Sequence, residues 1–220
     1  GSIYTFAGGK TYSVSETFII GQANGCAITT VKSNSPGTAA NFVSSATISS
    51  TYLDIQDISF TGVGSTTFTA NNSINNPNNN GINFGNLSPR NMYWIGGTGD
   101  WSDGSKWSLT SGGPSLGCPP SSADNLFFDQ NSFSAANQTF KIDIDNAACK
   151  NITWAGVTNN PTFNYNSKEL KVYKSYELDP NMSVTGNGTT NFAGTSTSTL
   201  DTKGNSLYSV NINGASVSLA

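Results

Sequence analysis

The sequence predicts an all-β protein, and within that class a right-handed parallel β-helix, or β-solenoid. Three observations lead to this expectation: the composition favours strands and turns, short apolar alternations run along most of the chain, and asparagines gather at the turns. A pair of β-sandwiches is the alternative architecture that the same strands allow.

The composition is poor in charge and in residues that favour helices. Charged residues make up only 10% of the 220 residues and hydrophobic residues 35%, whereas soluble domains typically carry roughly 25% charged residues. Ser, Thr, Asn and Gly take their place, which suits short strands joined by polar turns. We therefore expect almost no helix. The length allows one large domain or two small ones.

Two stretches of short alternating runs flank a segment rich in tryptophan and glycine. Apolar pairs recur about every ten residues or fewer, a spacing that suits a sandwich strand or one face of a β-helix turn. We expect β-helical coils over 1–88, a junction over 89–122, and further coils over 123–220, truncated at the C-terminus. Typical runs are TYSVSETFII and YLDIQDISF before the junction, and NLFFD, TFKIDID and ELKVYKSYEL after it.

Asparagine clusters favour the β-helix over the sandwiches. Stacked amides of successive coils can hydrogen-bond to one another, as in ladders of stacked strands. Runs such as NLFF and TFII also carry neighbouring apolar residues, which does not suit a half-exposed sheet. The clustered residues are Asn71, Asn72, Asn75, Asn76, Asn78, Asn79 and Asn80.

Charge and hydropathy exclude several classes of partner. The net charge of −3 and the isoelectric point near 4.7 argue against nucleic acid, whose recognition needs a dense basic footprint. No run approaches the roughly 18 apolar residues of a membrane span, and the first residues do not read as a signal peptide. Gly1 and Ser2 resemble a cloning scar, and NINGASVSLA ends while still alternating, so we expect a fragment of a longer chain.

The three cysteines match no zinc spacing. Cys118 and Cys149 flank a strand-like segment and form the candidate disulfide, which would indicate an oxidising compartment. Two buried free thiols are the alternative. Cys26 lies within an apolar alternation and is expected to be a buried free thiol.

The absence of histidine removes Ser-His-Asp and Cys-His catalysis and histidine-ligated metals. Asp143 and Asp145 share one face of a strand and would suit a carboxylate pair. Their alternation with isoleucines instead favours solvent-facing carboxylates. A lyase would need Lys141 or Arg90 as a base in a groove, and no pattern indicates one. We therefore expect no catalytic residues.

The stretch YWIGGTGDWSDGSKWS allows three interpretations. Trp94, Trp101 and Trp107 could form a carbohydrate platform, or they could pack together and start a module, which we favour. Asp100 and Asp103 could bind calcium through loop oxygens, but the full calcium-loop pattern is absent, so turn-forming aspartates are favoured. No cofactor other than calcium is indicated.

Two long segments carry a resemblance to known proteins. The first, containing SNSPGT, YLDIQD and NNPNNNGINF, resembles β-helical coils of very large Bacteroidota surface proteins. The second, YWIGGTGDWSDGSKWS followed by SADNLFFDQNSF and ACKNITWAGVTNNPTF, is similar to a module of gliding-motility-associated adhesins of that phylum. The resemblance spans roughly residues 10–165. It implies export by type IX secretion and a structural or adhesive role.

We therefore expect a non-enzymatic segment of an exported adhesin at the bacterial cell surface, acting in gliding motility or surface attachment. Its expected partners are neighbouring modules of the same chain and surface polysaccharide, without nucleic acid or a membrane span. A carbohydrate-binding module using exposed tryptophans with Tyr173 and Tyr176 is the alternative. A polysaccharide lyase or hydrolase is the third possibility.

Overall fold

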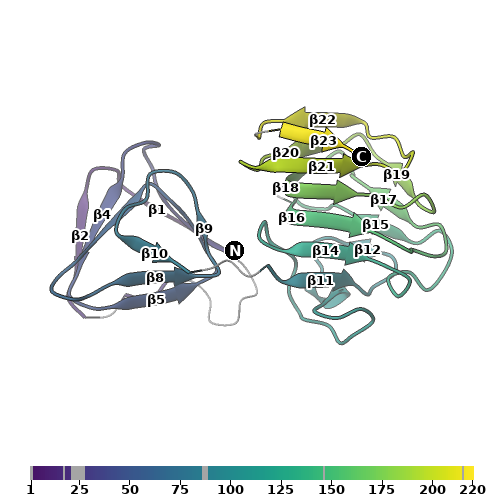
Figure 1. Ribbon diagram of the computed structural model, residues 1–220. Helices are drawn as coiled ribbons and strands as arrows, with labels where there is room; N and C mark the ends of the chain where they lie inside the picture. Colours follow the sequence, from purple (N-terminus) through teal and green to yellow (C-terminus); the bar gives the residue numbers. More distant parts are fainter. Residues whose placement is uncertain (1, 17, 21–27, 86–88, 146, 215) are drawn as a thin grey trace. The chain divides into compact units, whose positions relative to one another are not determined.

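The structure is a computed structural model that describes residues 2–16, 18–20, 28–85, 89–145, 147–214 and 216–220. It is an all-β solenoid of about nine turns with parallel stacked strands, which confirms the β-helix prediction. The only helical element of the described ranges is the short 3-10 turn η1 (Gly104–Lys106), so no helix there is long and apolar enough to cross a membrane. The chain divides into two compact units, Gly1–Ser88 and Pro89–Ala220 (Figure 1).

The first unit is built from short parallel strands. They are β1 (Ile3–Phe6), β2 (Thr11–Val14), β3 (Thr29–Ser33), β4 (Ala40–Ser44), β5 (Ile48–Thr51), β6 (Leu53–Gln56), β7 (Ile58–Gly62), β8 (Phe68–Asn71), β9 (Ile74–Asn75) and β10 (Ile82–Phe84). In the described residues they form the sheets β1-β3-β6-β9, β2-β4-β7 and β10-β8-β5. Consecutive strands belong to different sheets, and this unit has a triangular outline (purple to teal in Figure 1).

Alternation along these strands points every second side chain into the first unit. Buried and half-buried positions alternate in β3, β4 and β6, as the period of two in a strand requires. The register places Val31 beside Ile55 and Phe42 beside Phe60, so apolar side chains of successive turns stack on one another. Burying one such side chain contributes about 1.5–3 kcal/mol, which makes the stack the main source of stability.

The second unit continues the same principle with longer strands. They are β11 (Asn91–Trp94), β12 (Gly99–Asp100), β13 (Trp107–Ser108), β14 (Asn125–Phe128), β15 (Thr139–Lys141), β16 (Ala147–Trp154), β17 (Thr162–Asn164), β18 (Glu169–Glu177), β19 (Ser183–Thr185), β20 (Thr189–Phe192), β21 (Thr197–Asp201), β22 (Ser209–Ile212) and β23 (Ser216–Leu219). One sheet runs β13-β11-β14-β16-β18-β20-β22, with β21 joining β18 to β23, and the other runs β12-β15-β17-β19.

The large sheet of the second unit turns a corner along β18. The first half of β18 pairs with β20 through Leu170, whereas its second half pairs with β21 through Tyr176. Gly194 lies between β20 and β21, where a Cβ atom would come 1.9 Å from the carbonyl oxygen of Tyr173. Only glycine therefore allows the backbones of successive turns to approach this closely at the corner.

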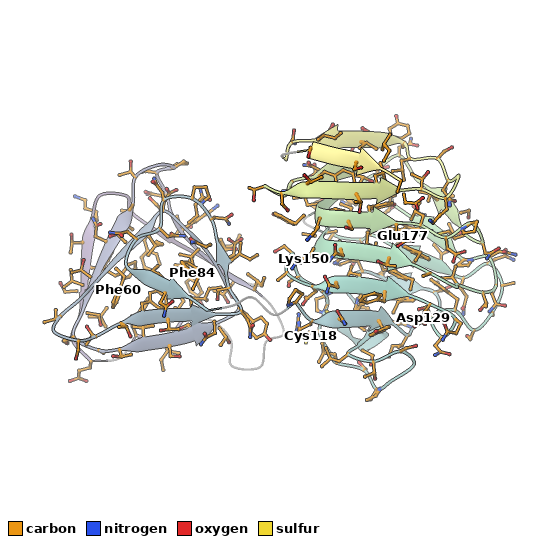
Figure 2. The ribbon with its side chains drawn as sticks, viewed as in Figure 1. Phe60, Phe84, Cys118, Asp129, Lys150 and Glu177 are labelled. Atoms are coloured by element: carbon orange, nitrogen blue, oxygen red, sulfur yellow. The ribbon has the colours of Figure 1, made fainter. Side chains whose placement is uncertain are left out.

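The interior of the second unit is a set of stacked columns. One column runs from Met92 through Leu126, Ile152 and Tyr176 to Leu200, and all five side chains are buried. Figure 2 shows how side chains fill the space between the strand faces of this unit. The core of the second unit is thus continuous from turn to turn.

Candidate functional site

The tryptophan-rich segment begins the second unit and folds back on its first strand. After β11 the chain forms β12 and η1, and then β13, which pairs with β11 in antiparallel orientation through Trp94 and Trp107. Every other strand pair of the described residues is parallel. β13 occupies the edge of β11 that faces away from β14, so this segment caps one end of the stack.

The three tryptophans of the motif are core residues. Trp94, Trp101 and Trp107 are exposed by 0%, 1% and 0%. Trp94 and Trp107 meet edge to face with ring centroids 5.1 Å apart. These rings present no face to a sugar, which corrects the hypothesis that they form a carbohydrate platform and agrees with the interpretation as a module start.

Backbone carbonyls within the motif satisfy two of its buried indole N–H groups. Trp94 Nε1 donates to the carbonyl oxygen of Gly97 at 2.9 Å, and Trp107 Nε1 donates to that of Trp101 at 3.0 Å. Gly97 has a φ of +62°, a left-handed conformation that glycine adopts readily. The glycines of the motif thus let the backbone bend until its own carbonyls reach the rings.

The two aspartates of the motif have structural partners. Asp100 forms an ion pair of 3.0 Å with Lys141 of the next turn. Asp103 caps η1, since its Oδ1 accepts hydrogen bonds from the backbone N–H of Ser105 at 3.0 Å and from its hydroxyl at 2.6 Å. These bonds lower the pKa of Asp103. In the described part of the chain no three side chains of the types His, Cys, Asp and Glu gather where they could hold a metal ion.

The predicted disulfide between Cys118 and Cys149 is wrong. Cys149 is a free thiol, fully buried in the core of the second unit, and this burial raises its pKa. It lies on β16 with its side chain inward, where it packs as a small apolar residue. Cys118 is disulfide-bonded. Cys26, which we expected to be a free thiol, lies outside the described residues.

A buried ion pair anchors the first turn of the second unit, and sequence reasoning missed its role. Arg90 Nε lies 2.8 Å from Asp124 Oδ1, and its Nη2 lies 2.7 Å from Oδ2, a two-point contact. The side chains are exposed by only 13% and 2%. Asp124 Oδ2 also accepts two hydrogen bonds from Ser121 at 2.8 Å. The signal that could have revealed this role is that Arg90 is the sole arginine of a chain with few charged residues.

The residues considered for hydrolysis or lyase chemistry are engaged separately. Asp143 accepts hydrogen bonds from the backbone N–H and the hydroxyl of Ser102, at 3.0 and 2.5 Å. Asp145 forms an ion pair of 2.6 Å with Lys168, and Lys141 pairs with Asp100. Each carboxylate thus ties one turn to another.

A small polar network lies inside the second unit. The hydroxyls of Tyr165 and Tyr176 are 3.0 Å apart, and that of Tyr165 is 2.5 Å from Thr190 Oγ1. Burial raises the pKa of Tyr165 to about 12 and that of Tyr176 well above its usual value. Tyr176 therefore belongs to the core, not to the exposed carbohydrate surface considered from the sequence, whereas Tyr173 is half-buried.

Turn asparagines of the first unit bond to carboxylates, to the backbone and in one case to another amide. Asn78 Nδ2 donates to Asp57 Oδ1 at 3.0 Å, and Asn76 Nδ2 donates to Asp54 Oδ1; both acceptors belong to the preceding turn. These two amides thus join successive turns through carboxylates, and the amide-to-amide bond, from Asn79 Nδ2 to Asn75 Oδ1 at 2.9 Å, lies within one turn.

An amide ladder is present instead on a strand face of the second unit. Asn125 Nδ2 donates to Asn91 Oδ1 at 2.9 Å, and Asn151 Nδ2 donates to Asn125 Oδ1 at 2.6 Å. Asn151 Oδ1 in turn accepts the backbone N–H of Ser175 at 3.0 Å. The ladder joins four successive strands on their outward side.

Beside the ladder, Tyr93 and Phe127 form an outward aromatic pair. Their rings are stacked with centroids 5.1 Å apart and an interplanar angle of 21°, and both side chains are half-buried. The alternation of β11 and β14 places them on the side opposite the core, since Trp94 and Phe128 point inward. Sequence analysis had assigned these aromatics no role beyond strand formation.

Together, the stacked parallel turns and the capped second unit define a β-solenoid protein. No family model, curated protein or solved structure matches the chain.

Proposed function

We propose that this chain is a non-enzymatic structural segment of a large exported bacterial cell-surface adhesin. The observation that carries the proposal is the continuous column of buried side chains from Met92 to Leu200. Each turn packs on its neighbours, so such a fold gains length by adding turns and presents long lateral faces. A rigid spacer between a cell and its target needs this ability to gain length while each turn stays packed on its neighbours.

Cross-links outside the core support the same role. The ion pairs Arg90–Asp124 and Lys141–Asp100 and the amide ladder each join residues of different turns. Contacts of this kind oppose separation of one turn from the next. They fit a segment whose task is to keep its shape.

Export is supported by chemistry and by resemblance. Cys118 is disulfide-bonded, and disulfides persist mainly in oxidising compartments such as the cell exterior. The low content of charged residues and the polar Ser, Thr and Asn surface fit an extracellular module. Type IX secretion, Bacteroidota and a part in gliding motility or surface attachment are proposed on the resemblance of the sequence motifs.

The non-enzymatic part of the proposal is supported by the bonding of the candidate catalytic groups. Asp143, Asp145 and Lys141 each hold a structural partner on another segment. A general acid or base must instead reach a proton of the substrate. Incubation with a panel of polysaccharides, followed by a reducing-end assay, should release no product; measurable turnover would contradict this part of the proposal.

Mechanical stability tests the structural role directly. We expect a chain tethered by its termini in an optical trap to resist load and then to extend in discrete, reproducible steps. Leu126→Ala, which opens a cavity in the central column, should lower the force of one step. Tyr208→Ala, at an exposed position, serves as the matched control and should leave the forces unchanged. Gradual extension from the lowest loads would contradict a load-bearing role.

A further inference from the structure

The outward face of β11, β14 and β16 combines the amide ladder with the aromatic pair. We call the set Asn91, Asn125, Asn151, Tyr93 and Phe127 the outer strip. We propose that the outer strip is a binding site for a neutral polysaccharide. This inference rests on the proposed adhesive role and names its ligand class and its residues.

The aromatic pair has no place in the core. Tyr93 and Phe127 occupy one outward column, which continues through Thr153 to Glu177 and Asp201. Polar residues thus occupy the later positions of the column, and Glu177 is seen on β18 in Figure 2. Two half-buried, stacked rings at its start form a carbon-rich surface on an otherwise polar face. Such a surface packs well against the C–H groups of a sugar ring.

The amides beside the rings retain hydrogen-bonding capacity. A side-chain amide has two N–H donors and two acceptor lone pairs. Among the described residues, Asn125 uses one donor toward Asn91 and one lone pair toward Asn151. One donor and one lone pair remain on Asn125, and Asn91, at the exposed end, keeps both donors. Sugar hydroxyls both donate and accept, so they match this mixed set.

The geometry of the outer strip favours a polymer over a single sugar. Neighbouring strands of a sheet lie about 4.8 Å apart, so the ladder repeats similar polar groups at short, regular intervals along the stack. A linear glycan also presents hydroxyls at regular intervals. Several weak contacts along one chain then act together.

The lack of charge in the outer strip favours a neutral ligand. No member of the strip is charged, and in the aromatic column the first acidic residue, Glu177, follows Thr153. The five residues of the strip include no cation, although Lys150 adjoins Asn151 on β16, and an acidic polysaccharide would meet the carboxylates of Glu177 and Asp201 further along. A neutral glycan meets no such penalty.

Affinity electrophoresis and calorimetry on the whole chain test the proposal. The probes are soluble mixed-linkage β-glucan, mannan, arabinoxylan and dextran, with alginate as the acidic comparator. At least one neutral probe should bind. The double variant Tyr93→Ser/Phe127→Ser should weaken that binding by roughly tenfold or more, since it removes both rings.

Two further variants keep the test decisive. Tyr208→Ser makes the same chemical change at a tyrosine that is 70% exposed and outside the outer strip, and it should bind like the parent chain. Asn91→Ala removes only the terminal amide of the ladder and should weaken binding severalfold, even if the double variant does not fold. Near-ultraviolet circular dichroism reports folding for each.

Three results would overturn the assignment: no binding of any neutral probe, equal binding by the strip variants and the Tyr208→Ser control, or preferential, salt-sensitive binding of alginate. None of these results would alter the unfolding steps of the parent chain under load. Loss of those steps would instead argue against the structural role itself, so the two proposals fail separately.

Discussion

The two units follow the same stacking rule with different side chains. The described core of the first unit is aliphatic and phenylalanine-based, whereas the second unit contains all four tryptophans of the chain. The second unit also begins with a strand turned back against its first edge. The comparison teaches that in this chain a compact aromatic segment covers the first strand edge of the second stack.

The two units also differ in their polar contacts. Turn amides of the first unit bond to carboxylates such as Asp57, whereas the second unit has a neutral ladder through Asn125. The second unit adds one buried ion pair, Arg90–Asp124, at its first turn. Its starting turn is therefore fastened by an aromatic cluster and by charge, and these two features can be removed one at a time.

Removing a capping tryptophan should have the largest effect. Trp107→Ala leaves a cavity between Trp94 and Trp101 and should lower the free energy of unfolding of the second unit by about 3–5 kcal/mol. Urea unfolding followed by tryptophan fluorescence reports this unit alone, because it holds every tryptophan.

Phe60→Ala, in the core of the first unit (Figure 2), is the matched control and should leave the fluorescence transition in place while shifting the far-ultraviolet transition. An unchanged fluorescence midpoint in Trp107→Ala would show that the cap does not stabilise the second unit.

Breaking the buried ion pair should have the second-largest effect on stability. Arg90→Ala leaves the Asp124 carboxylate buried without its cation and should destabilise the second unit by about 3 kcal/mol. The double variant Arg90→Met/Asp124→Leu should recover most of the loss, because no charge is then left unpaired. Equal destabilisation by the single and double variants, measured by urea unfolding, would contradict this explanation.

Alkaline pH should act selectively on the second unit. Burial raises the pKa of Tyr165 from 10.0 to about 12 in the folded state, so its contribution to stability is complete below about pH 10 and is lost as pH rises toward 12. The loss should amount to about 2–3 kcal/mol. The tyrosines of the first unit, Tyr4, Tyr12 and Tyr52, are exposed or half-buried.

Titration between pH 9 and 12, followed by tyrosinate absorbance and tryptophan fluorescence, measures the effect. Delayed ionisation of buried tyrosines together with unfolding of the second unit is the expected result. Free ionisation of all tyrosines near pH 10 without unfolding would contradict the buried network.

The smallest effect is expected in the amide ladder. Asn125→Ala removes the hydrogen bonds to Asn91 and Asn151 and should cost about 1–2 kcal/mol. Thermal unfolding monitored by tryptophan fluorescence should show a lower midpoint. Asn187→Ala, at an exposed turn of the same unit, provides the control, and equal shifts in the two variants would show that the ladder adds no stability.

The fold was largely predictable because its signal is local. Alternating runs such as ANFVS and the low content of helix-favouring residues predict strands without any knowledge of their partners. The candidate site was less predictable. Trp101 and Asp103 stand together in the sequence, yet one is buried and the other caps an exposed turn. The residue types in a tight loop do not show which side chains will point into the core and which will face solvent.

Long-range pairing explains the errors. The cysteine hypothesis joined Cys118 to Cys149 by their positions around one segment, but the stack turns Cys149 into the core. Asn91, Asn125 and Asn151 align only because β11, β14 and β16 share a register. A shift of the strand register by one residue would move such side chains to the other face.

By itself, the sequence determined the all-β class, the strand and turn positions along most of the chain, and the exclusion of histidine chemistry, because these depend on residue type and on a period of two. The tertiary structure alone decided which tryptophans are buried, that Arg90 meets Asp124, and where the amide ladder lies. Side-chain bonds between turns join residues far apart in the sequence, such as Asn125 and Asn151 at 26 positions and Arg90 and Asp124 at 34. At such separations the partners depend on the length and bend of every turn between them.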